Sequence, residues 1–170
     1  MDNSHGAGRF EYIQKLCDNS DFILIQEHWL VNNQSYLFEK RLSGIRSHSI
    51  SGMDDNTILK GRPFGGCAIL WNECLKFKVT PISTDCKRLC CIVVENGDFK
   101  LLICNVYMPT YSTSNDYITS FNETLSKISS LLMEHHIDHT VIGGDFNVNL
   151  KDHATAVYRY VNSFFAKRIL

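Results

Sequence analysis

The chain has 170 residues, which is enough for one domain with a hydrophobic core and too few for two independent domains. Hydrophobic residues make up 44% of it and charged residues 21%, so the composition excludes an intrinsically disordered chain. The formal charge of −1 excludes a broadly basic surface, and any affinity for nucleic acid must come from a local patch or a bound metal ion.

The cysteines and the apolar segments indicate where such a protein would be found. Seven cysteines are present, none at zinc-finger spacing from another cysteine or a histidine, and we interpret them as buried thiols of a reducing compartment. No apolar stretch has the length of a membrane span, and no basic segment followed by an apolar one opens the chain. We therefore expect a nuclear or cytoplasmic protein that is not secreted, does not bind membranes and has no stable protein partner.

The first third of the chain is expected to hold a helix, a strand, a loop and a second strand. Apolar residues at positions 10, 13, 16 and 17 recur at helical spacing, and the run Phe-Ile-Leu-Ile at residues 22–25 is typical of a strand buried on both faces. Residues 50–63 are rich in Gly, Asp and Asn, which favours a loop. Another apolar run, at residues 67–71, predicts the next strand.

The middle of the chain is expected to form an antiparallel meander. Strands are predicted at residues 77–82, 89–94 and 99–106. The dipeptide Asn96-Gly97 between the last two is the strongest short-range signal for a type I′ hairpin turn.

The last third is expected to add two helices around one more strand. The apolar spacing predicts an amphipathic helix over residues 117–132, a strand at residues 140–142 that leads into Gly143-Gly144, and a helix over residues 157–165. Residues 164–170 resemble a helix that lacks a partner to pack on. Because helices and strands are mixed throughout, the predicted class is α+β with layered sheets.

Polar side chains at strand ends are candidates for catalysis, because a rigid element holds them at the edge of the core. Glu27 follows the first strand, and its carboxylate suits a hard cation such as Mg²⁺. Asp145 and Asn147 are expected on one side of an extended segment, with Phe146 facing the core, so that the acid takes a proton from water while the amide fixes it. The alternatives are a solvated acid for Glu27 and an Asx-type turn for the pair.

Two further candidates concern contact with a phosphate backbone. Tyr107 ends a predicted strand shortly before Pro109, and its hydroxyl could donate to a phosphate, although a ring that packs on the core also fits the pattern. Arg62 lies in a loop with Phe64, where the pair could touch a nucleic-acid backbone and stack on a base. A solvated loop is the alternative.

Four segments, taken in order, carry a resemblance to a known family. They are Gln-Glu-His-Trp-Leu at residues 26–30, Gly-Arg-Pro-Phe-Gly-Gly at 61–66, Asn-Val-Tyr-Met-Pro at 105–109 and Gly-Gly-Asp-Phe-Asn at 143–147. Together they resemble the endonuclease/exonuclease/phosphatase superfamily, and most of all the apurinic-type endonuclease domain that precedes the reverse transcriptase in non-LTR retrotransposons. The resemblance covers residues 3–147. Four motifs in the right order are far more specific than any one of them.

The resemblance implies a fold, a cofactor and a role for each motif residue. The fold would be the four-layer α/β sandwich of the DNase I-like type, and the reaction would be metal-dependent nicking of double-stranded DNA through contacts to its backbone phosphates. The implied roles are metal binding (Mg²⁺ or Mn²⁺) by Glu27 and Asn3, activation of water by Asp145 with help from Asn147, phosphate contact by Tyr107, and substrate contact by Arg62 and Asn105.

The chain also departs from the family pattern. The strand before Asn3, the late acidic motif and the closing Ser-Asp-His segment are not found, and His153 stands too early in the order to replace the last of these. We therefore expect residues 1–170 to form a single partial domain, incomplete at the C-terminus, with little or no Mg²⁺-dependent nicking of its own. The alternatives are a non-catalytic remnant of a retrotransposon endonuclease and a phosphatase acting on a small phosphoester.

Overall fold

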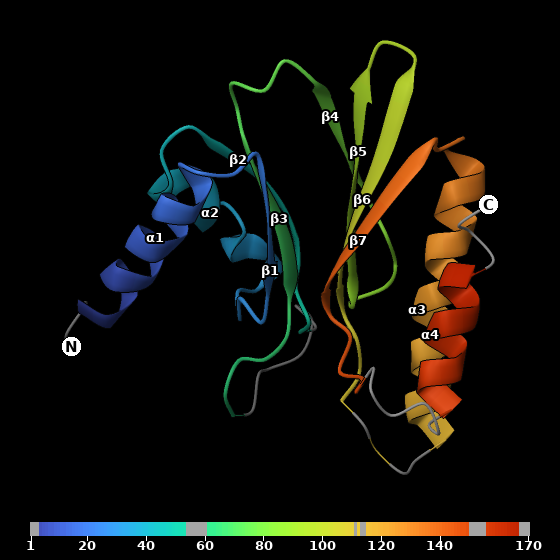
Figure 1. The fold of residues 1–170 in the computed structure, drawn as a ribbon. Helices are drawn as coiled ribbons and strands as arrows, with labels where there is room; N and C mark the ends of the chain where they lie inside the picture. Colours follow the sequence, from blue (N-terminus) through green and yellow to red (C-terminus); the bar gives the residue numbers. More distant parts are fainter. Residues whose placement is uncertain (1–3, 54–60, 111, 113–114, 150–155, 167–170) are drawn as a thin grey trace.

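The structure is a computed structural model, and it describes residues 4–53, 61–110, 112, 115–149 and 156–166. Two β-sheets pack face to face, and helices cover the outer face of each sheet (Figure 1). The predicted α+β class and the four-layer sandwich are both confirmed.

The first sheet has three antiparallel strands in the order β1-β3-β2. Helices α1 and α2 lie on its outer face (Figure 1). The sequence predicted α1, β1 and β3 but neither α2 nor β2. The bounds of these elements, with those of the 3₁₀-helix η1, are α1 Ser4–Cys17, β1 Phe22–Gln26, η1 Asn32–Gln34, α2 Leu37–Arg41, β2 Ile45–Ile50 and β3 Cys67–Asn72.

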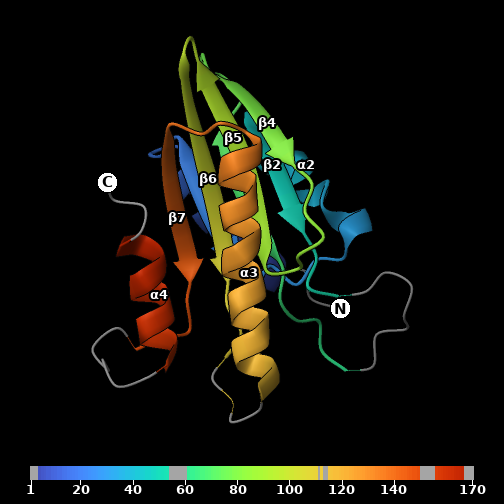
Figure 2. The ribbon, with the colours of Figure 1, turned by 90° about the vertical axis from the view of Figure 1, so that its right-hand side faces the viewer.

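The second sheet has four strands in the order β4-β5-β6-β7, and only β6 and β7 run parallel. The predicted meander is confirmed as β4, β5 and β6. Helices α3 and α4 lie side by side over the outer face (Figure 2). The bounds are β4 Lys78–Ile82, β5 Leu89–Asn96, β6 Phe99–Tyr107, α3 Asn115–Glu134, β7 His139–Asp145 and α4 Ala156–Ala166. Among the described residues, no helix has both the length and the apolar character needed to cross a bilayer.

Strand alternation explains why these sequences form four layers. In β5, Cys90, Ile92 and Val94 belong to the cluster buried between the two sheets, whereas Cys91 and Val93 belong to the cluster buried under α3 and α4. Successive side chains of a strand point to opposite faces, so a continuous apolar run supplies two cores at once. The sheet is therefore apolar on both sides and needs a layer on each.

The last helix has a packing partner in the described part of the chain. Val157, Val161 and Phe164 of α4 are buried in the same cluster as Phe121 and Leu125 of α3. The prediction that residues 164–170 lack a partner is therefore wrong for Phe164, while residues 167–170 lie outside the described residues.

The hairpin between β5 and β6 is confirmed, but its turn differs from the predicted type. Asn96 pairs with Phe99, so the two central residues are Gly97 and Asp98. Of these only Gly97 has a positive φ, of 60°. A type I′ turn needs positive φ at both central residues, whereas type II′ needs it at the first alone. The pairing shifts the turn by one residue from the predicted Asn96-Gly97 position.

His48 joins the two sheets through a contact that acid should weaken. Its Nε2 donates to the carbonyl oxygen of Ile82, 3.1 Å away, and burial lowers the pKa of His48 below its ordinary value of 6.5. Since the unfolded chain takes up this proton more readily, the contribution to stability is complete above about pH 6.5 and is lost as the pH falls through the lowered pKa. Urea denaturation at pH 7.5 and 5.5 should show this loss. The loss should be smaller in His48→Asn and unchanged in His136→Asn, where an exposed histidine is replaced.

Candidate active site

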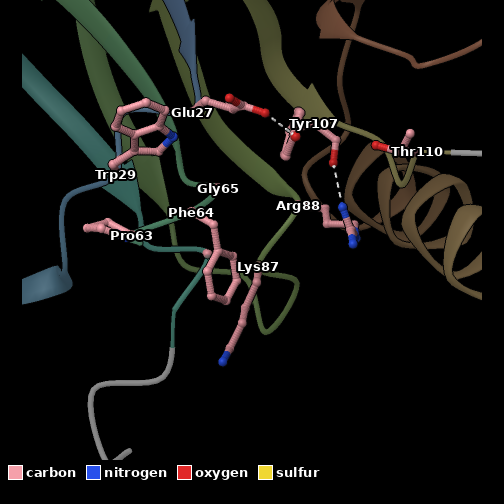
Figure 3. A pocket seen from close by; sticks show the side chains of 10 residues that line it. Glu27, Trp29, Pro63, Phe64, Gly65, Lys87, Arg88, Tyr107 and Thr110 are labelled. Atoms are coloured by element: carbon pink, nitrogen blue, oxygen red, sulfur yellow. Dashed lines mark hydrogen bonds between the residues drawn. The ribbon is translucent and has the colours of Figure 1, made fainter. Parts of the chain in front are cut away.

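Three strand ends meet at one edge of the sandwich. Tyr107 ends β6 beside Asp145, which ends β7, and the two residues are register partners in the parallel pair. The backbone amide of Met108 donates to the carbonyl oxygen of Asp145 at 2.8 Å, which extends this pairing by one residue. Glu27 follows β1 in the other sheet, and the Tyr107 hydroxyl donates to its Oε1 (Figure 3). The structure thus brings together three of the predicted site residues from two different sheets.

The Tyr107 phenol is surrounded by negative charge. Its hydrogen bond to Glu27, its burial and the charges of Glu27 and then Asp145 raise the pKa of Tyr107 to about 12, against a smaller opposing effect of Arg88. Both carboxylates are exposed to solvent. At neutral pH Tyr107 is therefore a protonated hydrogen-bond donor held beside two carboxyl groups. The sequence predicted a phosphate contact for this hydroxyl, which in the structure donates to Glu27.

Glu27 is presented by a backbone that departs from ordinary geometry. Glu27 and Trp29 both have positive φ, of 54° and 61°, which is costly for residues with a Cβ. Their backbone amides donate to the carbonyl oxygens of Gly66, at 2.8 Å, and Gly65, at 3.1 Å. Gly65 and Gly66 also have positive φ, of 66° and 95°, a conformation that glycine adopts without strain. Strain of the kind at Glu27 and Trp29 tends to persist where the surrounding structure fixes a functional group.

His28, which lies between Glu27 and Trp29, fixes this segment through two hydrogen bonds of its ring. Its Nδ1 accepts the backbone amide of Leu30 at 3.0 Å, so its Nε2 carries the proton and donates to the carbonyl oxygen of Ile50 at 3.2 Å. A Cβ on Gly66 would stand only 2.5 Å from the His28 ring. His28 is therefore a half-buried positioning residue, a role that the sequence around it did not indicate.

Asp145 and Asn147 are held by a turn and not by an extended strand. The backbone amide of Asn147 donates to Oδ1 of Asp145 at 2.9 Å, and Asn147 has a φ of 49°. This is the Asx-type turn that the sequence offered as the alternative. The side chain of Asn147 donates to the carbonyl oxygen of Met108 at 2.8 Å. Phe146 is half-buried against the core, as predicted. The turn leaves the two side chains on the same corner of the sheet, although strand alternation is not the cause.

Asn105 is buried and crosslinks the two sheets. Its Nδ2 donates to the carbonyl oxygens of Ile25 and Ala68, both at 2.8 Å, while its Oδ1 accepts Nε2 of Gln26 at 2.5 Å. The side chain is fully buried. The structure therefore gives Asn105 a positioning role, which aligns the strand of Tyr107 with the strand that carries Glu27, in place of the predicted direct contact with substrate.

The structure does not bring Arg62 into this cluster. Arg62 is exposed and does not line the pocket beside Glu27, although the following residues Pro63 and Phe64 do. Asn3 lies outside the described residues. Neither residue therefore receives a role from the geometry.

A pocket of about 490 Å³ opens beside Glu27 and Tyr107 (Figure 3). Its described lining includes Lys87, Arg88 and Thr110, none of which was singled out in the sequence. Nη1 of Arg88 donates to the carbonyl oxygen of Tyr107 at 3.3 Å, which places a positive charge next to Tyr107. Pairing β5 with β6 outward from the Gly97-Asp98 turn brings Arg88 opposite Tyr107, whereas the predicted Asn96-Gly97 turn would have placed Asn105 opposite Arg88.

The donor set suits Mg²⁺ or Mn²⁺ better than zinc. Mg²⁺ is usually held by one or two carboxylates, with water and substrate phosphates completing its coordination, and Glu27 and Asp145 supply two such groups. Among the described residues, no group of three or more His, Cys, Asp and Glu side chains converges to hold a metal ion. The described cluster therefore fits an open, water-rich site and lacks the ligands of a closed zinc centre.

Comparison with known sequences gives no match. No protein-family model matches the chain, and no curated protein matches it.

Comparison with solved structures identifies the fold. The endonuclease domain of TRAS1, a telomere-specific non-LTR retrotransposon, is similar with a TM-score of 0.64 and 13% identity over 95% of this chain and 65% of that one. Humanized TDP2 of D. rerio has a TM-score of 0.58, with 17% identity over 94% and 65% of the two chains. The 3′ phosphatase NExo from Neisseria, bound to product DNA hairpin, has a TM-score of 0.59, with 12% identity over 93% and 63%.

These neighbours share the DNase I-like fold of the endonuclease/exonuclease/phosphatase superfamily, and the chain has that fold. It spans slightly less than two thirds of the length of the structures it matches. Identities of this size establish the fold alone, so activity must be argued from the site.

Proposed function

We propose that this DNase I-like domain hydrolyses phosphodiester bonds in DNA with the aid of a divalent cation held by Glu27 and Asp145. The observation that carries the proposal is the meeting of these two carboxylates, from different sheets, around the Tyr107 hydroxyl. Isolated acids at strand ends are common. Here one acid accepts a hydrogen bond from a protonated phenol, a second acid lies near that phenol, and a pocket lined by Lys87 and Arg88 opens beside it, which suits a phosphate ester.

Each residue has a task that follows from its contacts. The cation would neutralise charge on the phosphate and on the leaving oxygen. Asp145, whose Oδ1 is fixed by the Asn147 amide, would accept a proton from the attacking water. Tyr107 orients Glu27 by donating to it, and Arg88 offers a fixed positive charge to the phosphate.

Nicking of supercoiled DNA tests this proposal. We expect slow conversion to the open circle in Mg²⁺ or Mn²⁺ and none in EDTA. Glu27→Gln and Asp145→Asn should each reduce the rate by about 100-fold or more, because each removes a charge from the reacting centre while keeping the shape of the side chain. Glu123→Gln, an exposed acid on α3, should leave the rate unchanged. Nicking that both active-site variants retain would contradict the proposal.

A second candidate is a domain that binds metal and DNA without cutting. One observation favours it: the described residues that line the pocket include two cationic side chains, a single carboxylate, that of Glu27, and no histidine. Cation-dependent binding of DNA that Glu27→Gln weakens, together with undetectable nicking in every metal tested, would support this candidate over the hydrolase.

The proposed activity also has a candidate biological setting. The TRAS1 neighbour is the endonuclease domain of a retrotransposon, and the motif at residues 26–30 resembles that type of domain. We therefore place the proposed DNA-nicking step in a retrotransposon context, which agrees with the expected nuclear or cytoplasmic location.

A further inference from the structure

Two large aromatic rings are exposed beside Glu27. Trp29 is 43% exposed and Phe64 is 57% exposed, and both line the pocket that contains Glu27 (Figure 3). Side chains of this size usually gain stability by burial, so two exposed rings in one pocket suit a ligand with a flat face.

The rings are carried by a fixed backbone. The amide of Trp29 donates to Gly65, the residue directly after Phe64, so the two aromatic segments are bonded to each other. The Arg9 guanidinium lies 5.7 Å from the centre of the Trp29 ring and covers part of it. A Cβ on Gly52 would stand within 3.0 Å of backbone atoms of residues 64–66, which shows how closely this loop is packed. The positions of the Trp29 and Phe64 segments are thus largely fixed before any ligand binds.

Positive charge stands on another side of the same pocket. Lys87 and Arg88 come from the loop that leads into β5, and Figure 3 shows Lys87 extending past the Phe64 ring. The whole chain has a net charge of −1, so this pair is a local feature. Aromatic faces next to cationic side chains are the combination that binds single-stranded nucleic acid, where bases stack on rings and phosphates meet the cations.

We propose that this pocket takes one unpaired nucleotide, with its base stacked on Phe64 or Trp29 and its phosphate beside Lys87 and Arg88. In a regular duplex both faces of each base are covered by neighbours, so neither ring could stack unless the nucleotide left the helix. A pocket of about 490 Å³ has the size of a small-molecule site, which a double helix cannot enter. The inference rests on the proposed function in its choice of DNA as the substrate, and it narrows that substrate to sites with an unpaired nucleotide.

Fluorescence anisotropy in EDTA tests the preference without requiring catalysis. Three labelled DNA probes of one sequence are compared: a perfect duplex, a duplex with one bulged nucleotide, and a single strand. We expect the last two to bind at least about five-fold more tightly than the perfect duplex, because stacking on an aromatic ring adds to the shared phosphate contacts.

Substitutions separate stacking from charge. Phe64→Ala and Trp29→Ala should each reduce the preference for unpaired probes several-fold while changing duplex affinity less than two-fold. Lys87→Ala should weaken the binding of all three probes by the same factor, because a phosphate contact does not depend on the base. Phe77→Ala is the matched control, since Phe77 is a 38% exposed ring in a separate groove with Arg46 and Trp71.

Trp29 also supplies a spectroscopic signal. Single-stranded DNA should quench its fluorescence in the wild type and not in Trp29→Phe, where the quenchable indole is removed. The inference would be overturned by any of three results. These are equal affinity for all three probes, an equal effect of Phe64→Ala on the binding of each probe, and no binding of any probe. Selective binding by a chain that never nicks DNA would contradict the hydrolase alone, and nicking without selectivity would contradict the unpaired-nucleotide site alone.

Discussion

Asn105→Ala is expected to lower the free energy of unfolding by about 3–5 kcal/mol. The substitution removes the acceptor for Gln26 and the donors for two carbonyl oxygens, those of Ile25 and Ala68. Buried polar groups that lose their partners cost about 1–3 kcal/mol each, and the fully buried position leaves little access for replacement by water. Urea denaturation followed by circular dichroism would measure the change.

The same variant should disturb a site that Asn105 does not touch. Gln26 directly precedes Glu27, so loss of the crosslink loosens the strand end that presents the carboxylate to Tyr107. Asn19→Ala provides the control, because among the described residues its exposed side-chain amide donates to the carbonyl oxygen of Lys15 in the adjacent helix end. A destabilisation of Asn105→Ala no greater than that of Asn19→Ala would show that the crosslink is unimportant.

Gly144→Ala is expected to destabilise the fold by about 3 kcal/mol or more. Gly144 has a φ of 130°, and a Cβ there would lie 2.0 Å from the carbonyl oxygen of Val106 and 2.8 Å from its nitrogen. Both atoms belong to the backbone of β6, which cannot move without breaking its pairing with β7. Two costs therefore add, one from the left-handed backbone and one from the overlap.

Gly97→Ala separates these two costs. Gly97 also has a positive φ, but nothing lies within 4 Å of the Cβ that would be added, so only the conformational cost of about 1 kcal/mol remains. In thermal unfolding, the midpoint temperature of Gly144→Ala should be clearly lower than that of Gly97→Ala. Since Asp145 follows Gly144, any folded Gly144→Ala protein should also have an altered site. Equal stabilities of the two variants would mean that β6 and β7 are not packed as described.

Strand ends were the most predictable part of this protein. The apolar runs that became β1, β6 and β7 end in Gln26, Tyr107 and Asp145, and polar residues at such positions face the rim of the core for simple reasons of burial. Gly144, directly before Asp145, also carried information, because only glycine tolerates the approach of the Val106 backbone. These signals are local, so they could be read from short segments.

The contacts that join distant segments were not predictable in this way. Arg88 acquires its position from pairing with Tyr107, 19 residues later, and the sequence around it has no periodic signal. Asn105 appeared in a motif and was assigned to the substrate, although burial between two sheets gives it another role. Strand β2 was missed because Arg46, Ser47, His48 and Ser49 are polar, and tertiary pairing overrides their weak strand preference.

Binding of Mn²⁺, followed by electron paramagnetic resonance, tests the two-carboxylate site most directly. The wild type should bind Mn²⁺ with competition by Mg²⁺, and Glu27→Gln and Asp145→Asn should each weaken binding by about ten-fold or more, with Glu73→Gln as an exposed control. Because both acids would hold the same ion, the Mn²⁺ affinity of the double variant should fall by less than the product of the two single-variant factors. Mn²⁺ affinity that neither substitution changes would contradict the account.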